Sequence, residues 1–301
     1  MGACYLNGRI VDLAEARVAA MDAGLQHGVG LFETMSARAT DGAVRITRLE
    51  AHMDRLAASA AALGLAETVR TGPLADAVKL TVERSALPRA RVRLTLTGGD
   101  LNLLGREGQP KRREPTILIV AQPAPDRPTR AGDSGGVTAV IADARANPLN
   151  PLEGHKTLNY WWRLRELQAA AAKGAGEAIV FQVTNYLCGG TVSNIFCAKG
   201  GRLITPIARG EEQEAAPGRA VAPSPALPGV TRAAVIELAN SRGVGVERRM
   251  VSIDDLMDAD EVFATNAMWG VLPITRIEQK QITSGGAGEL TRALAEALDD
   301  D

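Results

Sequence analysis

The residue of this chain best suited to covalent chemistry is Lys156, in the segment EGHKTLNYWW. A lysine is a nucleophile only when part of its population is neutral, which desolvation or a neighbouring cation favours by lowering its pKa. Lys156 comes directly before residues 157–174, which have the apolar spacing of a helix. By position alone, a surface lysine at a helix start is the plainer interpretation, although the helix dipole disfavours a cation there.

A second candidate for chemistry is the segment LPGVTR, in which Gly229 leads into a predicted helix that ends at Gly243. A helix start exposes backbone N–H groups, here those of Val230 and Thr231, and these bind phosphate together with the Thr231 hydroxyl. Arg55, in HMDRL, can add two parallel hydrogen bonds to a phosphate. Both residues also have an ordinary interpretation. Thr231 can simply cap the start of a helix, and Arg55 can be a solvated surface arginine.

A third feature is the segment YLCGGTVSNIF, which reads as a strand, a break and a second strand, with Gly189 and Gly190 at the break. Glycine inside a strand pattern marks a bulge or a place where another backbone or a ligand comes close. The sequence therefore predicts that something approaches this turn.

Strand-like and helix-like segments that mix along the whole chain predict an α+β fold. The predicted helices span residues 48–65, 72–87, 157–174, 230–243 and 289–300. The predicted strands span residues 4–12, 43–47, 90–99, 115–123, 137–144, 177–183, 186–190 and 193–206, with a strand, turn and strand in 261–277. Residues 121–136 are rich in Pro, Gly and charge, which predicts a linker between a small N-terminal domain, 1–120, and a larger domain, 137–301.

Composition argues against several classes of protein. The 34 basic and 35 acidic side chains among 301 residues give no charge excess that would favour nucleic acid or a membrane surface as a partner. No apolar run approaches the roughly 20 residues of a membrane helix. The three cysteines and three histidines have no metal-ligand spacing, and unpaired cysteines favour a reducing, cytoplasmic location.

Taken together and in this order, the segments resemble the class IV aminotransferases, which are fold-type IV pyridoxal-phosphate enzymes. The resemblance covers almost the whole chain and rests on eight segments: LNGRIV, MDAGLQHGVGLFETM, RLEAHMDRL, HKTLNY, GGTVSNIF, LITP, LPGVTR and EVFATNAMWGVLPI. It implies a two-domain α+β enzyme with pyridoxal 5'-phosphate at the domain interface.

The resemblance also implies roles for single residues. Lys156 matches the lysine that binds the cofactor covalently and then moves the substrate proton. Arg55 matches the arginine that holds the phosphate, and Val230 with Thr231 matches the helix start that cradles it. Glu33 and Asn194 lie in matching segments near the cofactor.

The chain departs from the family pattern at three positions. Relatives carry a glutamate that pairs with the pyridine nitrogen where this chain has Gly189, and Gly190 matches the small residue that lets the backbone approach the ring. Many relatives place a phosphate-binding hydroxyl where this chain has Ala267, so Asn266 and backbone would have to substitute. Relatives also commonly have an arginine at the position of Ala23.

Three functions follow from this resemblance. The first is transfer of an amino group from an amino acid to a 2-oxo acid. The second is an aminodeoxychorismate lyase that releases pyruvate and 4-aminobenzoate, since KTLNY and TNAMWG look more like the D-amino-acid and lyase groups than the branched-chain group. The third is a cofactor-binding relative whose catalysis is weakened by Gly189.

The resemblance further implies a homodimer, because family sites are completed by a loop of the partner subunit. The loop from Arg106 to Arg113 is the expected contributor, with Arg106 as a substrate contact. On its residues alone, this basic cluster is an ordinary solvated loop.

Overall fold

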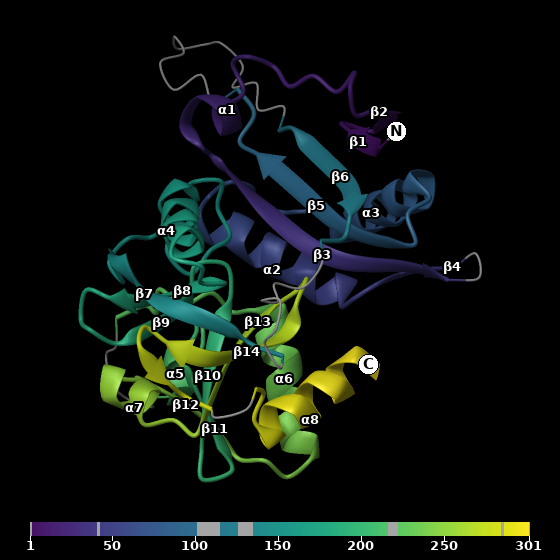
Figure 1. Ribbon diagram of the computed structural model, residues 1–301. Coiled ribbons are helices and arrows are strands. Elements are labelled where there is room, and N and C mark those ends of the chain that lie inside the picture. Colours follow the sequence, from purple (N-terminus) through teal and green to yellow (C-terminus); the bar gives the residue numbers. More distant parts are fainter. Residues whose placement is uncertain are drawn as a thin grey trace. The chain divides into compact units, whose positions relative to one another are not determined.

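The computed structural model describes residues 2–40, 43–100, 115–125, 135–215, 222–283 and 286–300 (Figure 1). The chain divides into two compact units. Unit 1 comprises Met1–Asp126 and His155–Asn159, and unit 2 comprises Arg127–Gly154 and Tyr160–Asp301. The short segment His155–Asn159, which carries Lys156, thus belongs with the N-terminal part of the chain.

Unit 1 is built on a six-stranded antiparallel sheet with the order β2-β1-β6-β5-β3-β4. Its strands are β1 (Ala3–Leu6), β2 (Arg9–Asp12), β3 (Gly30–Thr40), β4 (Ala43–Ile46), β5 (Arg89–Thr97) and β6 (Ile117–Pro123). Residues 4–12 form the β1–β2 hairpin, because Asn7 and Gly8 both take positive φ angles (46° and 92°) that suit a tight hairpin turn. The long strand β3 has no counterpart among the strands predicted from the sequence.

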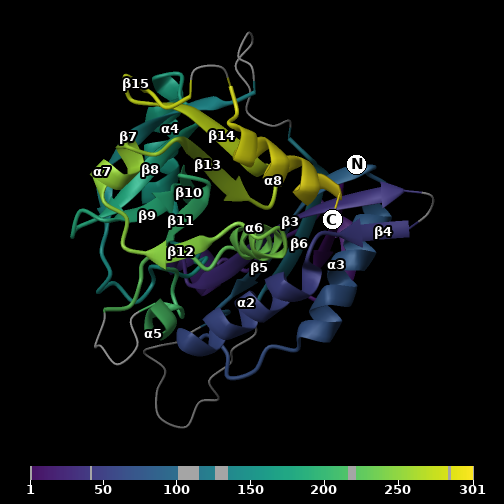
Figure 2. The same cartoon turned by 90° about the horizontal axis from the view of Figure 1, so that it is seen from below.

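The core of unit 1 lies between this sheet and two helices. Helices α2 (Leu49–Ala62) and α3 (Thr71–Ser85) lie side by side in Figure 2, while α1 (Ala23–His27) is a short helix before β3. Alternate residues of β5 are buried against the helices, as a strand with one covered face requires. The shared core includes Val92 and Leu94 of β5, Leu56 of α2 and Val78 of α3.

Unit 2 is built on a nine-stranded mixed sheet with the order β12-β11-β10-β13-β14-β7-β8-β9, and β15 pairs with β14. Its strands are β7 (Val137–Ala146), β8 (Glu177–Gln182), β9 (Leu187–Gly190), β10 (Asn194–Lys199), β11 (Arg202–Pro206), β12 (Val246–Arg249), β13 (Glu261–Asn266), β14 (Gly270–Ile277) and β15 (Lys280–Gln281). The predicted break in YLCGGTVSNIF is confirmed, since β9 ends at Gly190 and β10 begins at Asn194.

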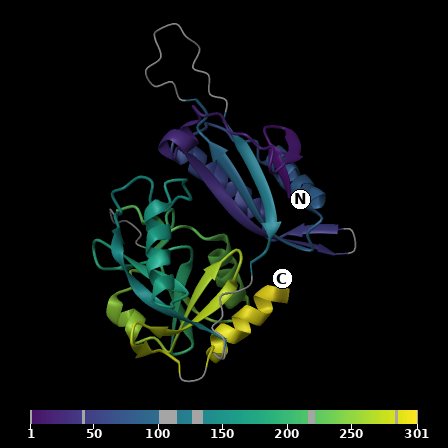
Figure 3. The ribbon, with the colours of Figure 1, turned by 45° about the horizontal axis from the view of Figure 1, so that its top comes forward.

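The helices of unit 2 cover the outside of this sheet. They are α4 (Trp161–Ala172), α5 (Glu212–Ala215), α6 (Val230–Ser241), α7 (Ile253–Met257) and α8 (Glu289–Asp300). Phe196 of β10 packs with α6 and α8, whereas its neighbours Ile195 and Cys197 face a separate core, because successive strand residues point to opposite faces. Figure 3 shows α8, in yellow, beside the sheet of unit 2.

The helix predicted over residues 157–174 begins later than expected. In the structure α4 starts at Trp161, and the residues before it pair with β3 of unit 1. Lys156 therefore lies in an extended segment beside a strand, and the interpretation as a lysine at a helix start is wrong.

Candidate active site

Lys156 is held by backbone and side-chain bonds on both sides. Its carbonyl accepts a hydrogen bond from the N–H of Phe32 (2.9 Å), and the N–H of Leu158 donates to the carbonyl of Gly30 (2.9 Å). The preceding residue, His155, is hydrogen-bonded through Nδ1 to the hydroxyl of Ser59 on α2 (3.0 Å). These bonds fix the backbone of Lys156 against the start of β3.

The side chain of Lys156 lies over an aromatic ring. Its Nζ is 4.4 Å from the centre of the Phe32 ring, and the guanidinium carbon of Arg93 is 3.8 Å from the same centre. Phe32 is only 3% exposed, so the two cations share a buried aromatic surface. The site thus combines an apolar wall with a second positive charge, the two features that make a lysine amine available for chemistry.

Glu33 and Arg55 form a bidentate ion pair in unit 1. Nε of Arg55 donates to Oε1 of Glu33 (2.9 Å) and Nη2 donates to Oε2 (2.6 Å). Glu33 follows Phe32 on β3 and is 1% exposed, whereas Arg55 comes from the facing helix α2. Two parallel charge-assisted bonds give this pair a defined geometry.

His52, one helical turn before Arg55 on α2, completes this cluster. Its Nδ1 lies 2.7 Å from Oε2 of Glu33. Burial by itself raises the pKa of the Glu33 carboxyl, but the charge of Arg55 and hydrogen bonds with His52 and Arg55 outweigh burial and lower it to about 2. An ionised carboxylate only accepts hydrogen bonds, so Nδ1 of His52 carries the donated proton. Burial lowers the pKa of His52, which keeps its ring neutral.

The glycine turn of unit 2 is tightly packed on a buried carboxyl group. A Cβ atom on Gly190 would lie 2.2 Å from the Ser193 hydroxyl oxygen and 2.7 Å from Oε2 of Glu177, so only glycine fits. At Gly189, whose φ is 158°, a Cβ would meet the backbone carbonyl oxygen of Ser193 at 3.0 Å, which is tighter than an ordinary van der Waals contact but less severe than at Gly190. What approaches the Gly190 backbone is thus the chain's own Glu177 and Ser193.

Glu177 is fully buried and is surrounded by neutral donors. The hydroxyls of Thr191 and Ser193 donate to it, Ser193 at 2.6 Å, and so do the N–H groups of Ala178 (2.9 Å) and Thr191 (3.0 Å). Burial raises the pKa of this carboxyl, and the hydrogen bonds oppose that shift only in part. Glu177 is therefore used inside unit 2 to hold the turn that connects β9 and β10.

Cys188, on β9 just before the two glycines, cannot supply the missing charge at Gly189. Burial raises the pKa of its thiol to about 11, although the nearby charge of Arg163 opposes the shift. Arg163 itself binds Glu153 (2.8 Å) and donates to the Gly190 carbonyl (3.3 Å). The thiol is neutral at physiological pH, so Cys188 adds no negative charge to this turn.

The start of α6 is joined to β10 through Asn194. Nδ2 of Asn194 donates to the carbonyl of Leu227 (2.8 Å), and its Oδ1 is 1.9 Å from the position that a Cβ on Gly229 would take. Because Gly229 has no side chain, it cannot cap the helix, and the first N–H groups of α6 have no partner within the helix. Val230 and Thr231 stand at this N-terminus, which suits an anion.

Asn266 and Ala267 lie where β13 ends and the turn to β14 begins, beside the loop between β9 and β10. Oδ1 of Asn266 accepts the N–H groups of Met268 (2.9 Å) and Trp269 (2.8 Å), and its Nδ2 is 3.4 Å from the carbonyl of Val192. Its side chain therefore shapes the turn and ties it to the loop between β9 and β10.

The structure groups the predicted residues into two sets. Unit 1 brings together Lys156, Glu33 and Arg55, and unit 2 brings together Gly189, Gly190, Asn194, Val230, Thr231, Asn266 and Ala267. The proximity of Lys156 and Thr231 stays a prediction, because they belong to different units. Arg106 and the Arg106–Arg113 loop lie outside the described residues.

The sequence analysis assigned no role to His52 or Glu177. His52 lies three residues before Arg55 and seven before Ser59, a helical spacing that places all three on one face of α2 and could have indicated a cluster. No comparable signal marked Glu177, because its contacts join β8 to residues 14 to 16 positions later.

Comparisons with known proteins show the family to which the chain belongs. The family model for amino-transferase class IV matches residues 30–277, which is most of the chain. The chain belongs to the class IV aminotransferases. A protein named as a putative branched-chain-amino-acid aminotransferase, from Methanocaldococcus jannaschii, is 34% identical over 300 residues, covering 98% of this chain and 95% of that protein.

Solved class IV aminotransferase structures resemble the whole chain. The branched-chain amino acid aminotransferase of Escherichia coli has a TM-score of 0.86 at 26% identity, covering 99% of this chain and 93% of that one. The T.th. branched-chain enzyme, solved with pyridoxamine 5'-phosphate, has a TM-score of 0.84 at 26% identity with the same coverage. The expected α+β, fold-type IV architecture is confirmed. None of the helices described for this chain is long and apolar enough to cross a membrane.

Proposed function

We propose that this class IV aminotransferase uses pyridoxal 5'-phosphate to transfer the amino group of an amino acid to a 2-oxo acid. The observation that carries the proposal is Lys156, whose backbone is held by β3 and α2 and whose amine lies over Phe32. Pyridoxal phosphate, when bound, supplies the electron sink and the amino-group carrier that amino acids themselves lack. The T.th. relative, solved with pyridoxamine 5'-phosphate, supports this choice of cofactor.

The residues present fit most parts of this cofactor. Lys156 provides the amine, Arg55 a guanidinium and the start of α6, which has no side-chain cap, the backbone N–H groups for a phosphate. The pyridine nitrogen is the exception, because Gly189 offers no carboxylate and the buried carboxyl of Glu177 is bound by Thr191 and Ser193. We therefore expect firm cofactor binding with slower proton removal from the substrate.

The proposal is tested by the absorbance band of the lysine-bound cofactor in the purified chain. We expect Lys156→Ala to lose the band and all transamination, because no other amine takes its place. Lys173→Ala is the matched control, since Lys173 is an exposed lysine at the end of α4 and its loss should change nothing. A wild-type chain without the band, or Lys156→Ala with full turnover, would contradict the proposal.

The names of the relatives guide the choice of substrate. The relatives described above are branched-chain enzymes, so we expect L-leucine, L-isoleucine or L-valine to be the preferred amino donor. The KTLNY segment favours D-amino acids as the second group to test. A panel of both groups with 2-oxoglutarate as acceptor separates them, and pyruvate release from aminodeoxychorismate would instead favour the lyase.

Location and assembly are also part of the proposal. Three free, buried cysteines are compatible with a cytoplasmic enzyme. A homodimer is expected from the family, with the Arg106–Arg113 loop as the segment that one subunit lends to the other. Light scattering of the purified chain tests this, and a monomer with full turnover would count against it.

A further inference from the structure

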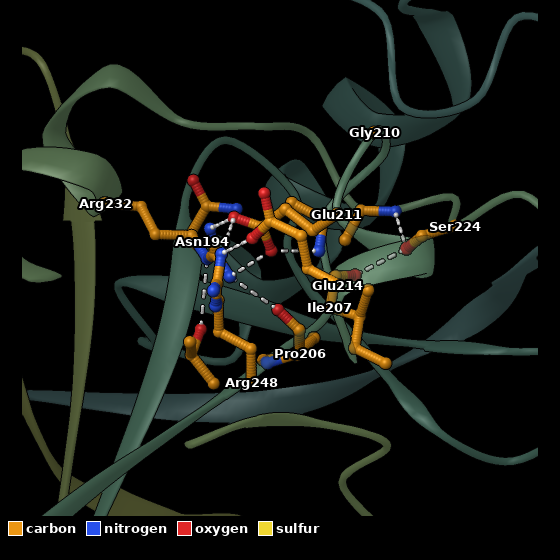
Figure 4. A network of polar contacts seen from close by, with 12 residues as sticks. Asn194, Pro206, Ile207, Gly210, Glu211, Glu214, Ser224, Arg232 and Arg248 are labelled. Carbon is orange, nitrogen blue, oxygen red and sulfur yellow. Dashed lines mark hydrogen bonds and ion pairs between the residues drawn. The ribbon is translucent and has the colours of Figure 1, made fainter. Parts of the chain in front are cut away.

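The first turn of α6 carries a buried arginine that binds a loop outside the helix. Arg232, two residues after Val230, is 2% exposed. Its Nη1 donates to Oε1 of Glu211 (2.7 Å) and its Nη2 donates to Oε2 (2.8 Å), as Figure 4 shows. Glu211 comes from the loop between β11 and α5, so the pair ties the start of α6 to that loop.

The same guanidinium also binds the end of β11. Nη2 of Arg232 donates to the carbonyl of Pro206 (2.9 Å) and Nε lies 3.3 Å from the Thr205 hydroxyl. Glu211 in turn accepts the N–H of Ala208 (2.8 Å), which closes a ring of bonds around the end of β11. Each polar group of Arg232 therefore has a partner within this network.

A cation in the first turn of a helix opposes the helix dipole, so the placement of Arg232 has a cost that a partner must offset. Glu211 supplies the opposite charge, because its bonds to Arg232 lower the pKa of its carboxyl against the raising effect of burial. An unpaired buried guanidinium would be strongly unfavourable. The two residues are thus a single unit in structural terms.

The N-terminus of α6 is held from both of its sides. Asn194 binds the carbonyl of Leu227, two residues before Gly229, and Glu211 binds Arg232, three residues after Gly229. The N–H groups of Val230 and Thr231, which have no partner within the helix, lie in the chain between these two fixed points. Their direction is set before any ligand arrives, and such preorganisation strengthens binding of an anion.

We propose that Glu211 and Arg232 are positioning residues for the phosphate group, acting by fixing the N–H groups of Val230 and Thr231 at the start of α6. This inference rests on the proposed function, because it assumes that the phosphate of the cofactor binds there. Neither Glu211 nor Arg232 is proposed to contact the ligand itself. Their effect falls on affinity for phosphate and leaves affinity for the rest of the cofactor unchanged.

The test compares three ligands on the cofactor-free full-length chain: pyridoxal phosphate, pyridoxal without phosphate, and inorganic phosphate as competitor. We expect Glu211→Gln, which removes the charge and keeps the shape, to weaken pyridoxal phosphate and inorganic phosphate by about tenfold, the scale of a lost charged hydrogen bond. Pyridoxal affinity should stay within twofold of wild type. Arg232→Lys, which keeps the charge but loses the paired bonds, should fall between Glu211→Gln and wild type.

The matched control is Glu214→Gln. Glu214 binds Arg248 (2.9 Å) at the outer, exposed end of the same network, so its loss should leave all three affinities unchanged. Circular dichroism and thermal unfolding establish that each variant is folded. If Glu211→Gln is unfolded, Arg232→Lys and Glu211→Asp carry the same comparison.

The outcomes are distinct. Equal weakening of pyridoxal and pyridoxal phosphate would mean general destabilisation and would overturn the proposal, as would unchanged phosphate affinity. Tighter phosphate binding in Glu211→Gln would also overturn it, because the released charge of Arg232 would then matter more than its position. A wild-type chain that binds neither cofactor nor phosphate would instead refute the proposed function.

Discussion

Unit 1 and unit 2 each bury a glutamate beside a candidate site, but the pKa values of the two carboxyl groups shift in opposite directions. Glu33 is paired with Arg55 and its pKa falls to about 2, whereas Glu177 is bound only by neutral hydroxyl and amide donors and its pKa rises. Burial disfavours the charged form of both groups. The partner, and not the depth of burial, decides in which direction the pKa of a buried acid shifts.

The difference assigns different tasks to the two acids. An ionised Glu33 holds a cation in one orientation beside Lys156, and so it shapes the electrostatics of that region. Glu177, with its raised pKa, holds the hydroxyls and N–H groups of the turn between β9 and β10, and so it shapes the backbone. Four changes of sequence or pH test this contrast.

The largest effect is expected from Arg55→Met, which leaves Glu33 buried without its cation. The free energy of unfolding at pH 7 should fall by about 3 kcal/mol, measured by urea denaturation. The double variant Arg55→Met with Glu33→Gln should recover much of the loss, because no buried charge remains. Lys79→Met, which removes an exposed ion pair with Asp76 on α3, is the control and should change stability by less than about 0.5 kcal/mol. An Arg55→Met protein as stable as wild type would contradict the prediction.

The second effect is the pH dependence of stability contributed by Glu33. Its pKa is lower in the folded chain, about 2, than the roughly 4.3 of an unfolded chain, so the folded state binds its proton less tightly. The stabilisation is present above about pH 5 and is lost as the pH falls from about 4.5 towards 2, by about 3 kcal/mol in total. Urea denaturation of wild type and Glu33→Gln at several pH values in this range should show that the variant loses less stability on acidification. Equal losses of stability in the two proteins would contradict this prediction.

The third effect comes from placing an acid in the turn that Glu177 supports. We expect Gly189→Glu to raise the single-turnover rate of amino-group transfer by about tenfold, or ~1.4 kcal/mol, because a carboxylate there favours a protonated pyridine nitrogen. Gly189→Ala is the matched control, since both variants put a Cβ 3.0 Å from the carbonyl oxygen of Ser193 and only one adds charge. A rate for Gly189→Glu no faster than that of Gly189→Ala, with cofactor fully bound, would show that the missing acid is not limiting.

The smallest effect is expected from Glu177→Gln. Because the folded state raises the pKa of Glu177, it binds the proton more tightly than the unfolded chain does, and stability from this group declines as the pH rises through the folded pKa. The neutral variant lacks this decline, so its stability relative to wild type should improve as the pH rises above the roughly 4.3 of an unfolded glutamate, measured by urea denaturation. Relative stability that worsens with pH would mean that Glu177 is stabilised in its charged form.

The sequence predicted most elements because their signals are local. The apolar periodicity of α2 and α3 and the glycine break between β9 and β10 each lie within a short stretch of chain. Strand β3 was not predicted because its first residues, 30–33, are all buried and do not alternate, and the alternation that follows is short. Helix α4 was predicted too long because the pairing of Thr157 with Leu31 cannot be read from neighbouring residues. Tertiary contact, and not propensity, decides those boundaries.

The candidate site was predictable to the same degree. Lys156, Arg55 and the start of α6 lie in segments whose sequence and order can be recognised. The residues that contact them do not lie in such segments. Glu211 and Arg232 are 21 positions apart in the chain, and nothing in the sequence around either residue indicates that they pair. Distances between such partners depend on how strands and loops return to one another, which composition and spacing do not encode.

The return of His155–Asn159 to unit 1 also constrains how this protein folds during synthesis. Leu31 pairs with Thr157, so β3 waits for residues made more than a hundred positions later. On a ribosome adding about 5–20 residues per second, the first unit leaves the exit tunnel while Leu31, which also pairs with Leu96 of β5, still lacks its bridge to Thr157. The segment that carries Lys156 completes the first sheet only after synthesis of the second unit has begun, so the nucleophile enters its place as a late step of folding.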